Sequence, residues 1–114
     1  MTTKIPEPVR RFVRDQIHSA GQLEVLLLLR AAPNREWSVE EVARAQVATV
    51  HMAERHLEDL QRRRLVLAVG HPPRYRYGPS AGVTDVIDAL ADAYATRRVT
   101  VIGLIFSTPS PSHR

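Results

Sequence analysis

Residues 37–77 read WSVEEVARAQVATVHMAERHLEDLQRRRLVLAVGHPPRYRY, and start and stop signals follow one another closely along this stretch. Ser38 and Glu41 have the spacing of a capping box, and Trp37 directly before them completes the N-terminal signal of a helix. The helix that starts here should be short, because residues 45–49 carry the turn to the next helix. The stretch therefore predicts two helices joined by a tight turn.

The second of these helices is expected to begin after Thr49, whose hydroxyl can cap its first turn. Its apolar positions lie three and four residues apart, as a single buried stripe requires. They are Val50, Ala53, Leu57 and Leu60. Three arginines, residues 62–64, suit the negative C-terminal end of this helix.

A short β-hairpin is expected next. Residues 65–69 are β-prone, residues 70–73 have the composition of a turn, and residues 74–77 alternate with period two. This alternation places Tyr75 and Tyr77 on one face of the hairpin and Arg74 and Arg76 on the other.

The flanking segments are expected to be helical. Pro6 and Pro8 favour the start of a first helix, and the S-x-x-Q motif at Ser19 favours the start of a second. A last helix is expected from Ser80. The segment Val99–Phe106 fits either a helical stripe or a strand, and we take it as a continuation of the helix.

The bulk properties fit one domain. The chain has 114 residues, 44% of them hydrophobic, with a formal net charge of +4 and no cysteine. The absence of cysteine excludes a disulfide scaffold, a thiol nucleophile and a cysteine-based zinc site. No signal peptide or membrane-spanning run is apparent, so a cytoplasmic, nucleoid-associated protein without membrane contact is expected.

Residues 40–66, together with the basic stretch at residues 74–77, resemble the winged helix-turn-helix family of bacterial transcription regulators. The resemblance implies a mainly α fold with a small β-hairpin and an added C-terminal helix. We expect residues 1–79 to form the winged helix-turn-helix domain, 80–106 a dimerisation helix packed on it, and 107–114 a disordered tail. Arg64 stands where the family usually has glycine, which predicts a changed helix exit or a strained backbone at this residue.

The family likeness implies that double-stranded DNA is the partner. The second helix of the pair would enter the major groove by its first turns, and the hairpin arginines would contact phosphate or the minor groove. The candidate DNA-binding residues are Thr49, His51, Met52, Arg55, His56, Arg74 and Arg76. Against this, the outer face of the helix also carries Glu54, Glu58 and Asp59, which phosphates would repel. The same face could therefore be merely solvated or serve a protein partner.

The last helix is not needed by a minimal winged helix, and an apolar stripe of its length usually marks an interface. The candidate dimer-interface residues are Val83, Ile87, Leu90, Tyr94, Val101 and Ile105. The resulting hypothesis is a homodimeric, sequence-specific DNA-binding regulator, most simply a repressor. The alternative is a protein-interaction module that docks on another regulator or a polymerase component without binding DNA, with the C-terminal helix as a candidate surface for such a partner.

No enzymatic, metal or cofactor site is predicted. His51 and His56 are five residues apart, so they diverge on a helix and do not match a zinc-protease motif. Asp85, Asp88 and Asp92 fit the solvated face of an amphipathic helix better than a pair of catalytic carboxylates.

Overall fold

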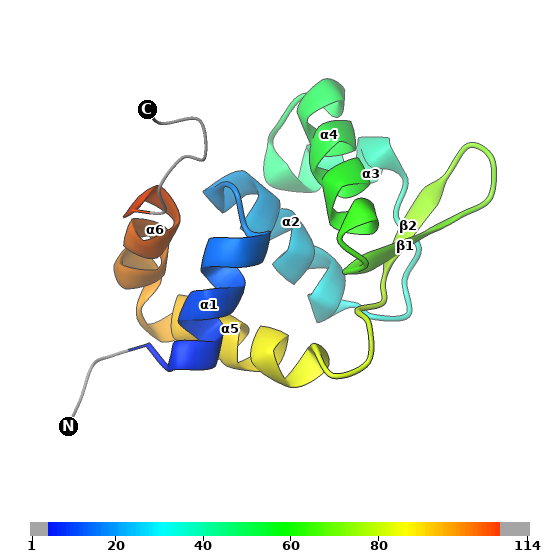
Figure 1. Ribbon diagram of the computed structural model, residues 1–114. Coiled ribbons are helices and arrows are strands. Elements are labelled where there is room, and N and C mark those ends of the chain that lie inside the picture. Colours follow the sequence, from blue (N-terminus) through cyan, green and yellow to red (C-terminus); the bar gives the residue numbers. More distant parts are fainter. Residues whose placement is uncertain (1–4, 108–114) are drawn as a thin grey trace, which may run out of the picture. The chain divides into compact units, whose positions relative to one another are not determined.

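The computed structural model describes residues 5–107, and within this range the chain forms six helices and one two-stranded sheet (Figure 1). The elements, in chain order, are α1 (Glu7–Gln16), α2 (Ala20–Ala31), α3 (Val39–Gln46), α4 (Val50–Arg62), β1 (Val66–Val69), β2 (Arg74–Tyr77), α5 (Thr84–Thr96) and α6 (Arg98–Ser107). The expected class, mainly α with a small hairpin, is confirmed. Among the described residues, no helix is long and apolar enough to cross a bilayer. The tail expected at 107–114 lies outside the described residues, except that Ser107 ends α6.

The chain divides into two compact units. We call Gly21–Gly82 the hairpin unit, and the paired segments Met1–Ala20 and Val83–Arg114 the helical unit. Within the helical unit, α1 contacts α5 and α6. The physical reason is the apolar stripe of α1, whose buried members are Val9, Phe12 and Val13.

The start of α3 is fixed by the capping box that the sequence predicts. The Ser38 hydroxyl accepts a hydrogen bond from the Glu41 N–H at 3.1 Å, and the Glu41 carboxylate accepts one from the Ser38 N–H at 2.9 Å. Trp37, directly before the cap, exchanges two backbone hydrogen bonds with Tyr75, at 2.8 and 2.7 Å. Trp37 thereby forms a one-residue bridge to β2 and links the start of α3 to the hairpin.

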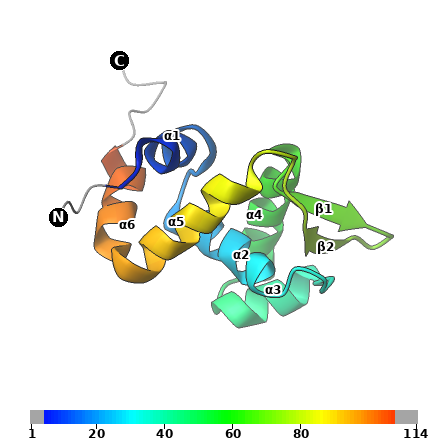
Figure 2. The ribbon, with the colours of Figure 1, turned by 90° about the horizontal axis from the view of Figure 1, so that it is seen from below.

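The helix α4 begins where Thr49 caps it, because the Thr49 hydroxyl accepts a hydrogen bond from the Met52 N–H at 3.1 Å. Of the predicted inward stripe, Ala53, Leu57 and Leu60 are buried. Val50 is the exception and is 46% exposed, since the neighbouring residues 47–49 are exposed and do not cover it. β1 and β2 pair antiparallel, and in both views the hairpin projects from the helices of its own unit (Figures 1 and 2).

The exit from α4 carries the backbone strain that the sequence predicts. Arg64 has φ 62°, in the left-handed region where glycine is the usual residue. This conformation lets the Leu65 N–H reach the Leu60 carbonyl at 3.0 Å, which closes the helix. A side-chain-bearing residue in this conformation costs about 1–2 kcal/mol.

The apolar segment at the C-terminal end forms two helices. The sequence predicts one stripe from Ser80 to Phe106, but α5 begins only at Thr84 and ends at Thr96, because the next residue, Arg97, has a non-helical φ of −137° and ψ of 52°. The segment Val99–Phe106 is helical within α6, as expected, and not a strand. Gly82 has φ 87° and delays the start of α5, because this conformation does not fit a helix.

Replacing Arg64 by glycine should stabilise the fold. Arg64→Gly removes the left-handed strain but adds unfolded-state entropy, so we expect the free energy of unfolding to rise by about 0.5–1 kcal/mol. Urea denaturation measures this change. Gln61→Gly is the matched control and should lower stability by about 1 kcal/mol, because Gln61 lies in the last turn of α4. Equal losses in both variants would contradict a strained Arg64.

Candidate nucleic-acid interface

The outer side of α4 presents one row of charged and polar residues. Its members are spaced four, three and four residues apart and are all exposed: His51, Arg55, Glu58 and Arg62. The buried side of the same helix is Ala53, Leu57 and Leu60, which hold α4 to the hairpin unit. A rod packed on one side and charged on the other can enter a groove without exposing its core.

The first turn of α4 and the turn before it are also exposed. Val47 is 93% exposed and left-handed at φ 53°, and the α3–α4 connection is thereby kept to three residues, 47–49. Met52 is 45% exposed. Thr49 is exposed as well, although its hydroxyl already caps α4. The N-terminal end of α4 is therefore open, as a helix that reads base edges requires.

Asp59 does not belong to the outer row. It accepts a hydrogen bond from the buried Gln22 of α2, and it forms ion pairs with Arg62 and Arg63, both at 3.0 Å. The sequence analysis counted Asp59 among the acids that would repel phosphate. Its charge is instead balanced by two neighbouring arginines and directed toward α2.

The other two acids of α4, Glu54 and Glu58, are exposed, and Glu58 belongs to the outer row itself. The pKa of Tyr75 in β2 is raised mainly by burial and further by the negative charges of Glu58 and Glu54. Two negative charges thus remain on the exposed side of α4.

His56 does not lie on the outer side of α4. It is half-buried, and its Nε2 lies 3.0 Å from the point where a side chain on Gly21 would begin. Burial lowers its pKa, the charge of Arg55 adds to this effect, and Asp59 opposes it. His56 packs α4 against α2, and a side chain at Gly21 would press against its ring.

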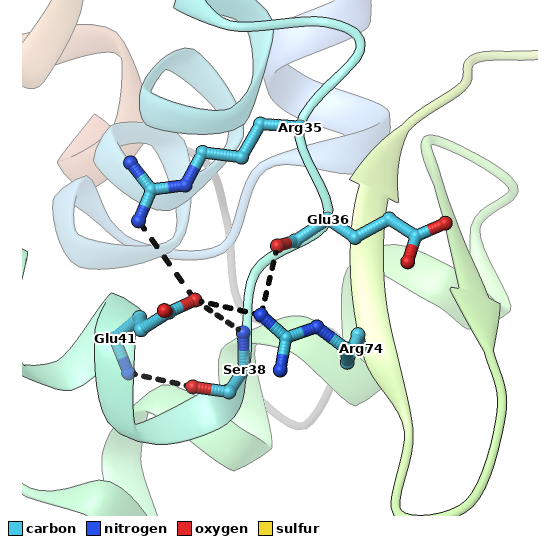
Figure 3. A network of polar contacts seen from close by, with 5 residues as sticks. All are labelled: Arg35, Glu36, Ser38, Glu41 and Arg74. Atoms are coloured by element: carbon cyan, nitrogen blue, oxygen red, sulfur yellow. Dashed lines mark hydrogen bonds and ion pairs between the residues drawn. The ribbon is translucent and has the colours of Figure 1, made fainter.

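The hairpin arginines have different surroundings. The Arg74 guanidinium lies 3.3 Å from both the Glu36 carbonyl and the Glu41 carboxylate, and it joins β2 to the start of α3 (Figure 3). Arg76 lies opposite Leu67, and its buried Nε has no hydrogen-bond partner among residues 5–107. Arg74 therefore has a structural task that sequence patterns did not indicate.

Arg35 also contacts Glu41, and the sequence analysis did not identify it. Its guanidinium lies 3.5 Å from the centre of the Trp37 ring and 3.8 Å from the Glu41 carboxylate. The pKa of Glu41 is lowered, first by the hydrogen bond from the Ser38 backbone and then by Arg74, Arg35 and Arg44. The capping box was the available signal, since it places a carboxylate where basic neighbours can gather.

Most of the candidate dimer residues are buried within the chain itself. Four of them are 6% exposed or less: Ile87, Leu90, Val101 and Ile105. Val83 and Tyr94 are half-exposed. The freely exposed apolar side chains of α6 are instead Val99 at 84% and Phe106 at 78%. The buried four are core residues, because each lies on the inward side of its helix.

No group of three or more His, Asp or Glu side chains that could hold a metal ion occurs among residues 5–107. His51 and His56 in particular are separated, since His51 is exposed while His56 packs toward α2.

No protein-family model and no curated protein matches the sequence. Solved structures of MepR, a transcription regulator of the Staphylococcus aureus multidrug efflux pump MepA, are similar in fold: 83% of this chain aligns with 74% of MepR at 16% identity and a TM-score of 0.56. A MepR mutant bound to an oligodeoxyribonucleotide gives the same coverage and identity with a TM-score of 0.55. This chain spans 64% of the length of another MepR mutant, with 75% of this chain covered, 18% identity and a TM-score of 0.55.

A possible transcriptional regulator from Methanosarcina mazei Go1 is also similar, with 82% of each chain aligned, 15% identity and a TM-score of 0.53. Because these identities are low, the likeness establishes the fold alone. The chain therefore has the winged helix-turn-helix fold that residues 40–66 predict, and it resembles regulators built on that fold.

Stability should depend on pH through His56. Its folded-state pKa lies below its ordinary value of 6.5, so the neutral ring is the form that the fold accepts. This contribution is present above pH 6.5 and is lost as the pH falls through the folded-state pKa, because the unfolded chain then binds the proton more readily. Urea denaturation at pH 7.5 and 5.0 should therefore show that the free energy of unfolding falls more between these two pH values for the natural chain than for His56→Gln.

His51→Gln is the control for this experiment, because His51 is exposed on the same helix. It should keep the full pH dependence of the natural chain. If His56→Gln keeps it as well, burial of His56 does not control the acid response.

Proposed function

We propose that this protein is a sequence-specific DNA-binding transcription regulator. The observation that carries the proposal is the outer row of α4, which is exposed along its length on a winged helix-turn-helix fold. The fold likeness to a MepR mutant bound to an oligodeoxyribonucleotide supports the same proposal.

The open end of α4 supplies the residues for base contacts. Arg55 has the fork geometry to bind guanine at O6 and N7, and Met52 offers an apolar contact to a thymine methyl group. His51 lies one turn before Arg55 in the same row. Thr49 lies at the N-terminal end of α4, where a phosphate is favoured. His56 is withdrawn from this set because it packs against α2.

The phosphate contacts of this proposal depend on few cations. Arg62 is 68% exposed although it pairs with Asp59, and the Arg74 side chain is 46% exposed although it pairs with Glu41. Both can reach a phosphate with the side that is still in solvent. With few such contacts, the salt dependence of binding should be shallower than for a strongly basic DNA-binding domain.

A homodimer completes the proposal, and repression by occupying a promoter is its simplest mechanism. Two exposed apolar residues on α6, Val99 and Phe106, lie seven positions apart and so on one side of the helix. A twofold interface would cover them and present two copies of α4 to a two-part DNA site. In this form the interface uses Val99 and Phe106 with the half-exposed Val83 and Tyr94, and not the four buried residues.

The second candidate is a protein-interaction module that binds no DNA. The observation in its favour is that two exposed acids, Glu54 and Glu58, lie on α4, with Glu58 in the outer row itself. Phosphates passing these acids would be repelled, whereas a basic protein surface would be attracted.

DNA binding predicts retention on duplexes that the protein itself selects from a random-sequence pool. Arg55→Ala should weaken binding to the selected duplex by about 1–3 kcal/mol, because a bidentate contact to guanine is lost. Fluorescence anisotropy at several salt concentrations measures both the affinity and its salt slope. Arg14→Ala is the matched control, since the Arg14 side chain is 51% exposed in the helical unit.

Selection that enriches no sequence, together with no retention at low salt, would reject the DNA-binding proposal in favour of the protein module. Loss of binding in Arg74→Ala alone would not decide the matter, because that change also breaks the link between β2 and α3.

The dimer proposal predicts that charges on α6 separate the subunits. Val99→Glu combined with Phe106→Glu should convert a dimer into a folded monomer, because both side chains are exposed in the single chain. Sedimentation velocity gives the mass, and circular dichroism checks the fold. Ala45→Glu, which adds a charge to an exposed site on α3, should leave the mass unchanged. A natural chain that sediments as a monomer at high concentration excludes this dimer.

A further inference from the structure

Three exposed apolar side chains lie close together in the sequence where α4 begins. Val47 is 93% exposed, Val50 46% and Met52 45%, and we call these three residues the apolar cluster. They belong to the α3–α4 turn and the first turn of α4. Within residues 5–107, the hairpin unit has two other large exposed apolar residues, Leu67 and Val69, and both lie in β1. The apolar cluster is therefore a feature of this end of α4.

The side chain of Val47 strains the backbone and contributes little packing. Its φ of 53° and ψ of 50° are left-handed, a conformation that β-branched residues strongly disfavour. The conformation itself ends α3, because the Val47 N–H reaches the Arg44 carbonyl at 3.3 Å and the Ala48 N–H reaches the Ala43 carbonyl at 2.9 Å. Glycine would make the same hydrogen bonds without the strain. The fold thus requires this backbone conformation but not a valine.

Val50 is equally unsuited to its place as the first residue of α4. Valine is a weak helix former, and an acidic residue here would complement the positive end of the helix. The first turn of α4 nevertheless contains no acid. Residues 47–53 as a whole contain no aspartate, glutamate, lysine or arginine. The side chains at this end of α4 therefore suit an apolar group better than a charged one.

We propose that Val47 and Val50, together with Met52, determine DNA specificity by contacting thymine methyl groups. In the major groove thymine presents its C5-methyl group, and apolar side chains contact it. The apolar cluster lies at the end of α4 that the proposed function places against the bases, so this inference rests on that function. The DNA site consequently carries thymines where it meets the α3–α4 turn, in addition to the guanine bound by Arg55.

The test uses the full chain and the duplex that it selects from a random-sequence pool. Each thymine of this duplex is replaced in turn by deoxyuridine, which lacks only the methyl group and keeps the hydrogen-bonding edge. At the thymines that meet the apolar cluster, the natural chain should bind about fourfold more weakly, the effect of one buried methyl group. Fluorescence anisotropy measures each dissociation constant.

Two variants assign the methyl groups to individual side chains. Val50→Ala should bind the thymine duplex more weakly and should lose the response to deoxyuridine at one position. Val47→Gly should lose the response at another position, yet it should melt roughly 2–8 °C higher, because it removes the left-handed strain. Arg55→Ala is the matched control. It should weaken binding to the thymine and deoxyuridine duplexes by the same factor, because Arg55 contacts a different base.

The inference is overturned if deoxyuridine changes the affinity of the natural chain at no position, or if both valine variants keep the full response to deoxyuridine. A lower melting temperature for Val47→Gly would show that the valine serves the fold and would overturn its assignment to DNA. Binding to a selected duplex without methyl dependence rejects this inference alone, whereas selection of no duplex rejects the proposed function together with it.

Discussion

Glu41 joins the three parts of the hairpin unit that must be held together. Its carboxylate accepts the Ser38 N–H and so starts α3, and the same oxygen lies 3.3 Å from Arg74 of β2 and 3.8 Å from Arg35 (Figure 3). These contacts lower the pKa of Glu41, which keeps it ionised at neutral pH. Since Trp37 also pairs with Tyr75, the position of the hairpin follows from the start of α3. The helix α4 packs on α3, so its position also follows from the start of α3.

The arginines of the chain are divided between holding the fold and facing solvent. Arg63 and Arg74 form ion pairs with carboxylates of the same chain. Arg55 forms no ion pair within residues 5–107 and is exposed on α4. The number of arginines therefore overstates how many free cations a polyanion would meet. For a DNA-binding protein this division favours contacts to bases over a broad attraction to phosphate, because base contacts carry the sequence preference.

The exit from α4 combines backbone strain with a charged side chain. Arg64 adopts a left-handed backbone, its carbonyl accepts the Ser80 N–H at 3.0 Å, and β1 begins two residues later. A glycine here would fold with less strain but would carry no charge. Strained residues that persist in a fold often mark a functional position, because some other interaction must compensate for them. At Arg64 the hydrogen bond from the Ser80 N–H to its carbonyl is one such interaction.

Local rules account for what the sequence alone determined. The capping box at Ser38, the Thr49 cap, the buried stripe of α4, the hairpin and the strain at Arg64 each depend on residues within a few positions of one another. The structure has all of them, except that Val50 of the stripe is exposed. Helix periodicity also identified the apolar stripe near the C-terminus, but not its break at Arg97.

Tertiary packing decided the rest. Arg74 meets Glu41 across 33 positions, and Gln22 meets Asp59 across 37, so no local pattern could pair them. His56 was predicted to contact DNA because it lies near the start of α4, but it is half-buried against Gly21 of α2. The four buried residues of α5 and α6 show the same limit: periodicity tells which side of a helix is apolar, while only the packed chain decides whether that side is covered by the chain itself.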